Sequence, residues 1–254
     1  MHVSDDDGVR TVTFDRPDAR NALTPDIAAD LADTVDAVAV DTHDAVVLAG
    51  EGPAFSAGGD IEAMAAREET AAEGYDRIRA TFGRLAESVL ECPVPVLARV
   101  HGDAVGAGLS LVAVSDIAVA ATDARFGAAF VHVGLIPDTG GTVLLPRLVG
   151  LRAAKRLVFT GDLVSASEAA DLGLVSAAVP ADELDDRVEG FLETFRARPT
   201  ETIALAKEGL HGVLGNGIGE GLGYEAQLEA LAADSDAHEE GVAAFLEDRD
   251  PDFD

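Results

Sequence analysis

A glycine-rich stretch that follows a short apolar strand decides the fold of this chain: Gly50-Glu51-Gly52-Pro53-Ala54-Phe55-Ser56-Ala57-Gly58-Gly59-Asp60-Ile61. A second stretch of the same kind follows another strand-like run and opens a helix: His101-Gly102-Asp103-Ala104-Val105-Gly106-Ala107-Gly108-Leu109-Ser110. Glycine lets a ligand approach backbone N–H groups closely, and a helix start adds a positive dipole. Two such turns can direct one N–H each at the same oxygen atom and form an oxyanion hole. Taken singly, the first stretch also fits an ordinary strand-to-helix loop.

The flanking segments alternate between strands and helices. Short β-rich or apolar runs predict strands at 9–14, 45–49, 95–100 and 116–121. Thr24-Pro25-Asp26 is typical of a helix start, because it offers a capping hydroxyl, a proline at the first helical position and an acid in the first turn. A further helix is expected over 75–91. Successive units of strand, strand and helix favour the α/β class.

The pattern after Gly150 is mostly helical. One strand-like interruption lies at 174–179, and a possible capping box begins at Ser165. Helices are expected over 182–196, 200–213, 217–234 and 237–246. We therefore place a boundary near residue 195. It separates a catalytic core, residues 1–195, from a helical region, residues 196–254, that packs on its neighbours or on another subunit.

Composition and charge exclude several classes of partner. The 254 residues are 48% hydrophobic, which indicates a globular protein, and carry 18 Lys+Arg against 47 Asp+Glu, a formal charge of −29. Nucleic acids and anionic membranes need clustered cations, so neither is expected as a partner.

Three features of the sequence bear on its location. The lone Cys92 excludes an intrachain disulfide, and the first seven residues are acidic rather than leader-like. No apolar run approaches the roughly 20 residues of a membrane span. These features predict a cytoplasmic protein.

Common catalytic motifs are missing from the sequence. Neither a G-x-x-x-x-G-K-[ST] loop nor a G-x-G-x-x-G opening after the first strand occurs. Ser56 is not in a nucleophile elbow, because Ala54 holds the position of the first glycine in G-x-S-x-G. The six histidines lack the spacing of metal ligands. We expect no metal site and no permanently bound cofactor.

A third segment brings a carboxylate: Gly134-Leu135-Ile136-Pro137-Asp138-Thr139-Gly140-Gly141-Thr142. Asp138 stands after a proline and before paired glycines that open a helix. One interpretation is a helix N-cap, a role that lowers the pKa of an aspartate. The other is an acid/base residue, whose pKa an apolar wall beside it would raise.

These three segments, in this order, resemble the enoyl-CoA hydratase/isomerase (crotonase) superfamily. The resemblance covers nearly the whole chain, with further motifs at Asp15-Arg16-Pro17, Asn21-Ala22-Leu23, Phe126-Gly127, Leu157–Gly161, Ala169–Val175 and Glu240–Leu246. It implies a crotonase (ClpP-like) fold of repeated ββα units with a helical C-terminal trimerisation region. It also implies a coenzyme A thioester substrate and a homotrimer, or a hexamer made as a dimer of trimers.

The resemblance also assigns site residues. By position, the backbone N–H groups of Ala57 and Ala107 would hold the thioester oxygen. The family's adenine-binding stretch falls on Ala57, Gly58, Gly59, Asp60 and Ile61, and its pantetheine and phosphate contacts begin near Arg16 and Ala19. Further candidates for the phosphates are Arg20, Lys207 and Arg198.

Departures from the family pattern bear on the reaction. Hydratases of the family carry two glutamates where this chain has Ser110 and Phe130. Ser110 is interpreted as a packing residue, and the alternative is a remaining polar contact. Asp138 falls where several isomerases place their acid/base carboxylate, and its surroundings are most similar to the 1,2-epoxyphenylacetyl-CoA isomerase branch. Phe130 and Pro137 would then line the substrate site. The expected activity is an enoyl-CoA double-bond isomerase. The alternatives are an enoyl-CoA hydratase of fatty-acid β-oxidation and a catalytically silent acyl-CoA-binding subunit.

The charge of −29 predicts a protein adapted to a very salty, halophile-like cytoplasm. The other interpretation is a mildly acidic protein of an ordinary host. At molar salt the Debye length falls to about 3 Å, so repulsion among surface carboxylates is largely screened. We expect the unfolding free energy to rise steeply between dilute buffer and molar KCl, measured by urea titration. Full stability in dilute buffer would contradict the salt adaptation.

Overall fold

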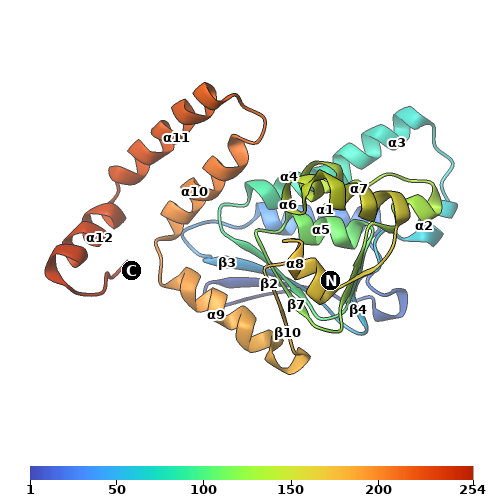
Figure 1. The fold of residues 1–254 in the computed structure, drawn as a ribbon, viewed down its shortest axis with the longest axis horizontal. Helices are drawn as coiled ribbons and strands as arrows, with labels where there is room; N and C mark the ends of the chain where they lie inside the picture. The colour runs from blue at the N-terminus through green and yellow to red at the C-terminus, as the bar shows by residue number, and fades with distance from the viewer. Residues whose placement is uncertain (254) are drawn as a thin grey trace.

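The computed structural model describes residues 1–253 and is built around a six-stranded sheet (Figure 1). The strand order is β1-β2-β3-β5-β7-β10, and all neighbours are parallel except the edge pair β1–β2. The strands are β1 (His2–Asp6), β2 (Val9–Phe14), β3 (Ala45–Gly50), β5 (Val96–Val100), β7 (Ile117–Ala121) and β10 (Ala177–Val179).

A second sheet of four short strands adjoins the first, in the order β4-β6-β8-β9. Its strands are β4 (Ala54–Ser56), β6 (Asp103–Val105), β8 (Arg125–Gly127) and β9 (Val164–Ser165). Each long strand β3, β5 and β7 is followed by one of these short strands, and in the first two repeats a helix comes next. This is the expected repetition of ββα units, and it places β4 and β6 side by side as a parallel pair. The predicted α/β class with repeated ββα units is confirmed.

Helices cover both faces of the large sheet. The first helices are α1 (Pro25–Asp36), α2 (Ile61–Ala65), α3 (Ala71–Ile78), α4 (Arg84–Glu91) and α5 (Ala107–Val114). They are followed by α6 (Gly141–Leu148), α7 (Gly150–Thr160), α8 (Ala166–Asp171) and α9 (Leu184–Arg196). The main core lies between the sheet and α1, α4 and α5, and a smaller core joins the opposite face to α9. Strand β3 contributes to both cores because its alternate side chains point to opposite faces.

Local signals predicted these elements well. Thr24 caps α1 as expected, since its hydroxyl accepts the N–H of Ile27, and Ser165 caps α8 in the same way. The helix expected over 75–91 is instead α3, a π-helical turn at Arg79–Gly83 and then α4. Strand β1 escaped prediction because all of its residues are exposed at the sheet edge, so it carries no hydrophobic alternation.

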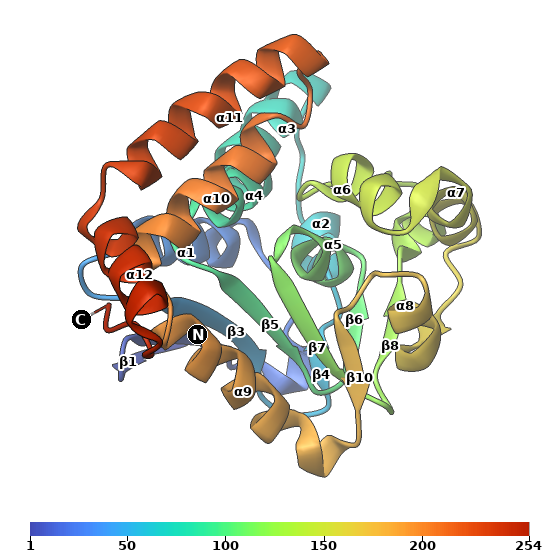
Figure 2. The same cartoon turned by 60° about the vertical axis from the view of Figure 1, so that its left-hand side comes forward.

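Three C-terminal helices form an arm that extends away from the core: α10 (Thr200–Gly212), α11 (Ile218–Ala233) and α12 (Asp236–Glu247) (Figures 1 and 2). The predicted boundary near 195 falls within the last turn of α9. No helix in the described part of the chain is long and apolar enough to cross a membrane.

A buried lysine fastens the arm to the core. Lys207 of α10 is 7% exposed, and its Nζ donates to the carbonyls of Val89 and Val94 and to Asp116 Oδ2, at 3.0, 3.1 and 2.6 Å. Asp116 Oδ2 also accepts the backbone N–H of Val96 at 2.7 Å. These three acceptors use the full donor capacity of the ammonium group. Lys207 is therefore a structural anchor, and its proposed role toward substrate phosphates is wrong.

Replacing Lys207 by methionine should leave the partly buried Asp116 without this cation. Breaking a buried pair from one side costs about 3–5 kcal/mol. We expect the unfolding free energy of Lys207→Met to fall by about that amount in a urea titration. Arg79→Met is the matched control, because the Arg79–Glu87 pair is half-exposed; its loss should be much smaller. Equal losses in both variants would contradict the anchoring role.

Candidate functional site

The two glycine-rich turns meet where β4 and β6 end. Gly58 has φ +92°, and a Cβ atom there would lie 2.6 Å from the Val105 carbonyl oxygen and 3.1 Å from the Ala107 nitrogen. Only glycine permits so close an approach with this backbone conformation. Gly108 is equally constrained, since a Cβ there would lie 2.5 Å from the Ser56 carbonyl oxygen. The contact brings the first turn against the start of α5.

The amide of Ala57 is not the one that faces the site. Its N–H donates to the Arg20 carbonyl at 2.9 Å. The residues that follow Ala57 pair with Leu23. The N–H of Leu23 donates to the Gly58 carbonyl, and the N–H of Asp60 donates to the Leu23 carbonyl. This pairing leaves the N–H of Gly59 without an acceptor among residues 1–253.

The assignment of Ala57 as a thioester-oxygen donor is therefore corrected to Gly59. The reason is physical, because an amide already bonded within the protein cannot also hold a ligand at full strength. Ala107 keeps its assigned place. It is the first residue of α5, so its N–H has no acceptor within the helix. Gly59 and Ala107 thus offer two backbone donors on either side of the Gly58 contact.

A buried asparagine holds the first turn in place, which sequence reasoning did not identify. Asn21 is 1% exposed with φ 55°, and its side chain donates to the carbonyls of Glu51 and Ala54 and accepts the N–H of Arg16. The Asn21 carbonyl in turn accepts the Ser56 hydroxyl at 2.9 Å. The only sequence signal for this role was the Asn21-Ala22-Leu23 motif.

Asp138 is a largely buried carboxylate with few internal partners. Helix α6 starts at Gly141 with Gly140 as its N-cap, so Asp138 does not cap the helix and that interpretation is wrong. Its side chain accepts the Thr139 hydroxyl at 3.1 Å. Burial raises the pKa of the Asp138 carboxyl, while bonds from Thr139 and from its own amide and the charge of Arg77 act in the opposite direction. The direction is the one expected for an acid/base residue.

Helix α5 packs against α6, the helix that follows the turn carrying Asp138 (Figure 2). A Cβ atom on Gly141 would lie 2.5 Å from Ser110 Oγ and 3.0 Å from Pro137 Cβ. Ser110 is fully buried, and its hydroxyl is without a hydrogen-bond partner in the described chain. Phe130 is 7% exposed and belongs to the main core, and its carbonyl accepts the N–H of Leu135. Its role as a wall beside Asp138 stays a prediction.

The residues assigned to coenzyme A line the other side of the first turn. Arg16 donates to Asp60 Oδ2 at 2.9 Å and to the Ala22 carbonyl at 2.6 Å, so it ties the first loop to the start of α2. Asp60 caps α2 by accepting the N–H of Ala63, and this bond, together with Arg16, lowers the pKa of its carboxyl. Ala19 lies in a short 3-10 helix beside Arg16, and Ile61 is 55% exposed.

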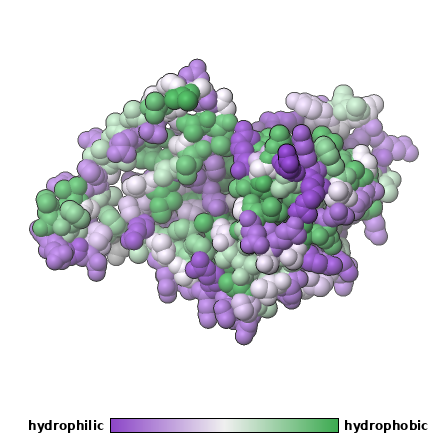
Figure 3. Space-filling view, in the orientation of Figure 1, coloured by the Kyte–Doolittle hydropathy of each residue, from purple (hydrophilic) through white to green (hydrophobic). Residues whose placement is uncertain are grey.

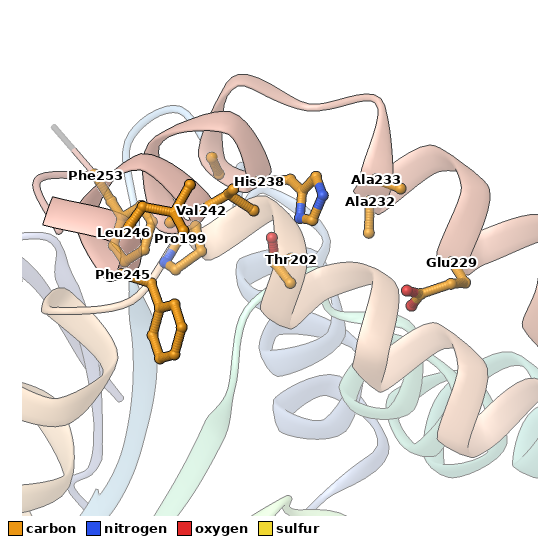
Figure 4. A pocket seen from close by; sticks show the side chains of 12 residues that line it. Pro199, Thr202, Glu229, Ala232, Ala233, His238, Val242, Phe245, Leu246 and Phe253 are labelled. Carbon is orange, nitrogen blue, oxygen red and sulfur yellow. The ribbon is translucent and has the colours of Figure 1, made fainter. Parts of the chain in front are cut away.

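Two further observations concern metal ligands and a cavity away from Asp138. No group of three or more histidine, cysteine, aspartate or glutamate side chains within residues 1–253 is arranged to hold a metal ion. A cavity of about 530 Å³ lies in the C-terminal arm, between α10 and α12, lined by Pro199, Thr202, Val242, Phe245 and Phe253 among others (Figure 4). It is made by other elements than those that carry Asp138, Gly59 and Ala107.

The opposite pKa shifts of two aspartates predict opposite effects on stability. Asp138 has a raised pKa, so its ionisation opposes folding above that pKa, and the cost disappears as the pH falls toward 3.8. We expect Asp138→Asn to raise the urea midpoint at pH 7.5 and to lose this gain near pH 4. Asp60, with a lowered pKa, is the control: Asp60→Asn should lower the midpoint at pH 7.5. A destabilised Asp138→Asn protein at pH 7.5 would contradict the burial of an uncompensated charge.

Comparisons with known proteins agree with this geometry. The sequence model of the family described as "Enoyl-CoA hydratase/isomerase" matches residues 4–254. The 1,2-epoxyphenylacetyl-CoA isomerase of Escherichia coli is 33% identical, with 97% of this chain and 95% of that protein covered. The 2,3-dehydroadipyl-CoA hydratase of the same organism is 34% identical, with 99% and 97% covered. The crystal structure of an enoyl-CoA hydratase from Mycobacterium smegmatis has a TM-score of 0.92 at 36% identity, with 99% and 98% covered. The chain is an enzyme that belongs to the enoyl-CoA hydratase/isomerase family of the crotonase superfamily.

Proposed function

We propose that this enzyme is an enoyl-CoA isomerase that shifts a double bond in an acyl-CoA thioester, with Asp138 as the proton shuttle. The observation that carries the proposal is the chemistry of three positions. Asp138 is partly buried with a raised pKa, while Ser110 and Phe130 occupy the places where a hydratase would need carboxylates. Adding water requires a group that activates the water and a group that delivers a proton. A phenyl ring can do neither.

One carboxylate is enough for the isomerisation. It removes a proton from the carbon α to the thioester, and the electron pair moves into a dienolate whose negative charge gathers on the thioester oxygen. The N–H groups of Gly59 and Ala107 would stabilise that oxygen, and losing one such donor costs roughly 3–4 kcal/mol. The same carboxyl then returns its proton to the γ carbon, so the product has the mass of the substrate. The raised pKa of Asp138 favours the first proton transfer, because it makes the carboxylate a stronger base than that of an exposed aspartate.

Binding of the coenzyme A part involves the loop of residues 16–20. Arg16 is held by Asp60, which neutralises part of its charge, whereas the guanidinium of Arg20 has no partner within residues 1–253. Arg20 is therefore the stronger candidate for a charge-assisted bond to a phosphate.

The proposed assembly is a homotrimer or a pair of trimers. Apolar side chains are exposed along the C-terminal arm, and Figure 3 shows such residues gathered on that part of the surface. They are Leu210, Leu214, Ile218, Leu222, Leu231, Phe245 and Leu246. Exposed apolar patches of this kind mark contacts between proteins.

The chain is about equally similar to an isomerase and to a hydratase. Addition of water to a 2-enoyl-CoA is therefore the second candidate reaction. Purified protein in molar KCl, incubated separately with a 3-enoyl-CoA and a 2-enoyl-CoA, separates the two. We expect the 3-enoyl thioester to gain the absorbance of a conjugated thioester at unchanged mass. Rapid addition of one water to the 2-enoyl thioester would establish a hydratase instead. Inactivity on both, with binding retained, would favour a silent binding subunit.

Asp138→Asn tests the base directly. We expect the isomerisation rate to fall by about 10²–10⁴-fold, since a positioned acid/base residue contributes that much, with affinity for a saturated acyl-CoA preserved. Asp123→Asn is the control, because Asp123 is an exposed aspartate away from the site. Unchanged turnover in Asp138→Asn would show that another group moves the proton.

A further inference from the structure

The Ser110 hydroxyl is a polar group that the proposed reaction does not use. The side chain is 0% exposed, and its Oγ makes no hydrogen bond within residues 1–253. Three other hydroxyls have partners within the protein: Ser56 bonds the Asn21 carbonyl, Ser115 the Leu111 carbonyl and Thr139 the Asp138 carboxylate. A buried hydroxyl without a partner costs free energy that an alanine would not. A buried hydroxyl that lacks a partner beside a substrate site therefore indicates a ligand that hydrogen-bonds to it.

Ser110 lies between the two halves of the site. It is three residues after Ala107 on α5, so both are on one face of the helix, and side chains of a helix lean back toward its N-terminus. The Ser110 Oγ therefore leans toward the first turn of α5, where the Ala107 N–H lies. On the other side, a Cβ atom on Gly141 would come within 2.5 Å of this Oγ and within 3.0 Å of Pro137. Val114, one turn further on, packs in the same way against Gly140.

We infer that Ser110 Oγ hydrogen-bonds an oxygen atom on the acyl group, on one of the first carbons beyond the thioester. This inference rests on the proposed function, because it takes the thioester oxygen to be held by Gly59 and Ala107. A hydroxyl can donate to an ether or carbonyl oxygen and can also accept from an alcohol. Ser110 would thereby make the site selective for oxygen-bearing acyl thioesters over plain hydrocarbon chains. This replaces the interpretation of Ser110 as a packing residue.

Binding measurements on two thioesters test this assignment. Butyryl-CoA and 3-hydroxybutyryl-CoA differ by one oxygen, and their Kd values can be measured by calorimetry in molar KCl, with the ligands checked by mass for turnover. We expect wild-type protein to prefer the hydroxylated ligand. Ser110→Ala should weaken binding of 3-hydroxybutyryl-CoA about tenfold and leave butyryl-CoA unchanged. Ser110→Ala should also unfold at the same or a higher temperature, since no internal bond is lost.

Ser115→Ala is the matched control. It removes a hydroxyl at the end of the same helix that already has a partner, so stability should fall and the ratio of the two Kd values should stay as in wild type. An unchanged ratio in Ser110→Ala would overturn the proposal and leave Ser110 as a packing residue. Equal weakening of both ligands would overturn it as well, because a bound water would then be the partner. Failure of wild-type protein to bind either thioester would instead overturn the proposed function.

Discussion

The close approach of two glycine-rich turns is the constraint on which the rest of the site depends. Gly58 sits within van der Waals contact of the Val105 carbonyl and the Ala107 amide, where no side chain would fit. The contact exists because β4 and β6 pair as parallel strands, so both turns leave the small sheet at the same edge. Two backbone donors are thereby fixed before any ligand arrives. Preorganised donors of this kind need no rearrangement when negative charge develops, which is why they stabilise transition states so effectively.

The charged side chains at the surface and the buried Lys207 contribute to stability in different ways. Several arginines pair with exposed carboxylates, and such pairs contribute little to stability in high salt. Lys207 differs because burial shields its bond to Asp116 from the solvent ions. The arm that bears the exposed apolar residues is therefore attached by an interaction that salt does not weaken. Asp138 is the reverse case, because it is a partly buried carboxylate without a paired cation, and its raised pKa means that its ionisation lowers stability.

Much of the architecture could be predicted because it rests on local chemistry. The Thr24 cap, the apolar run of β3 and the glycine pairs each express a preference of a few adjacent residues. The short strands β4, β6, β8 and β9 could not be predicted in this way, since two or three residues carry no periodicity. Strand β1 lacked a signal for another reason: all of its residues are exposed at the sheet edge, so none of them needs to be apolar.

By itself, the sequence determined the fold class, the family resemblance and the position of the carboxylate proposed as the acid/base residue, because those follow from residue identity and order. Only the tertiary structure decided which amide faces the ligand, since the Ala57 N–H is taken by Arg20 and the Gly59 N–H is not. It also decided that Lys207 is an anchor and that Ser110 is buried without a partner. Each of these three findings depends on contacts between residues more than 30 positions apart. Local sequence patterns do not report contacts of that range.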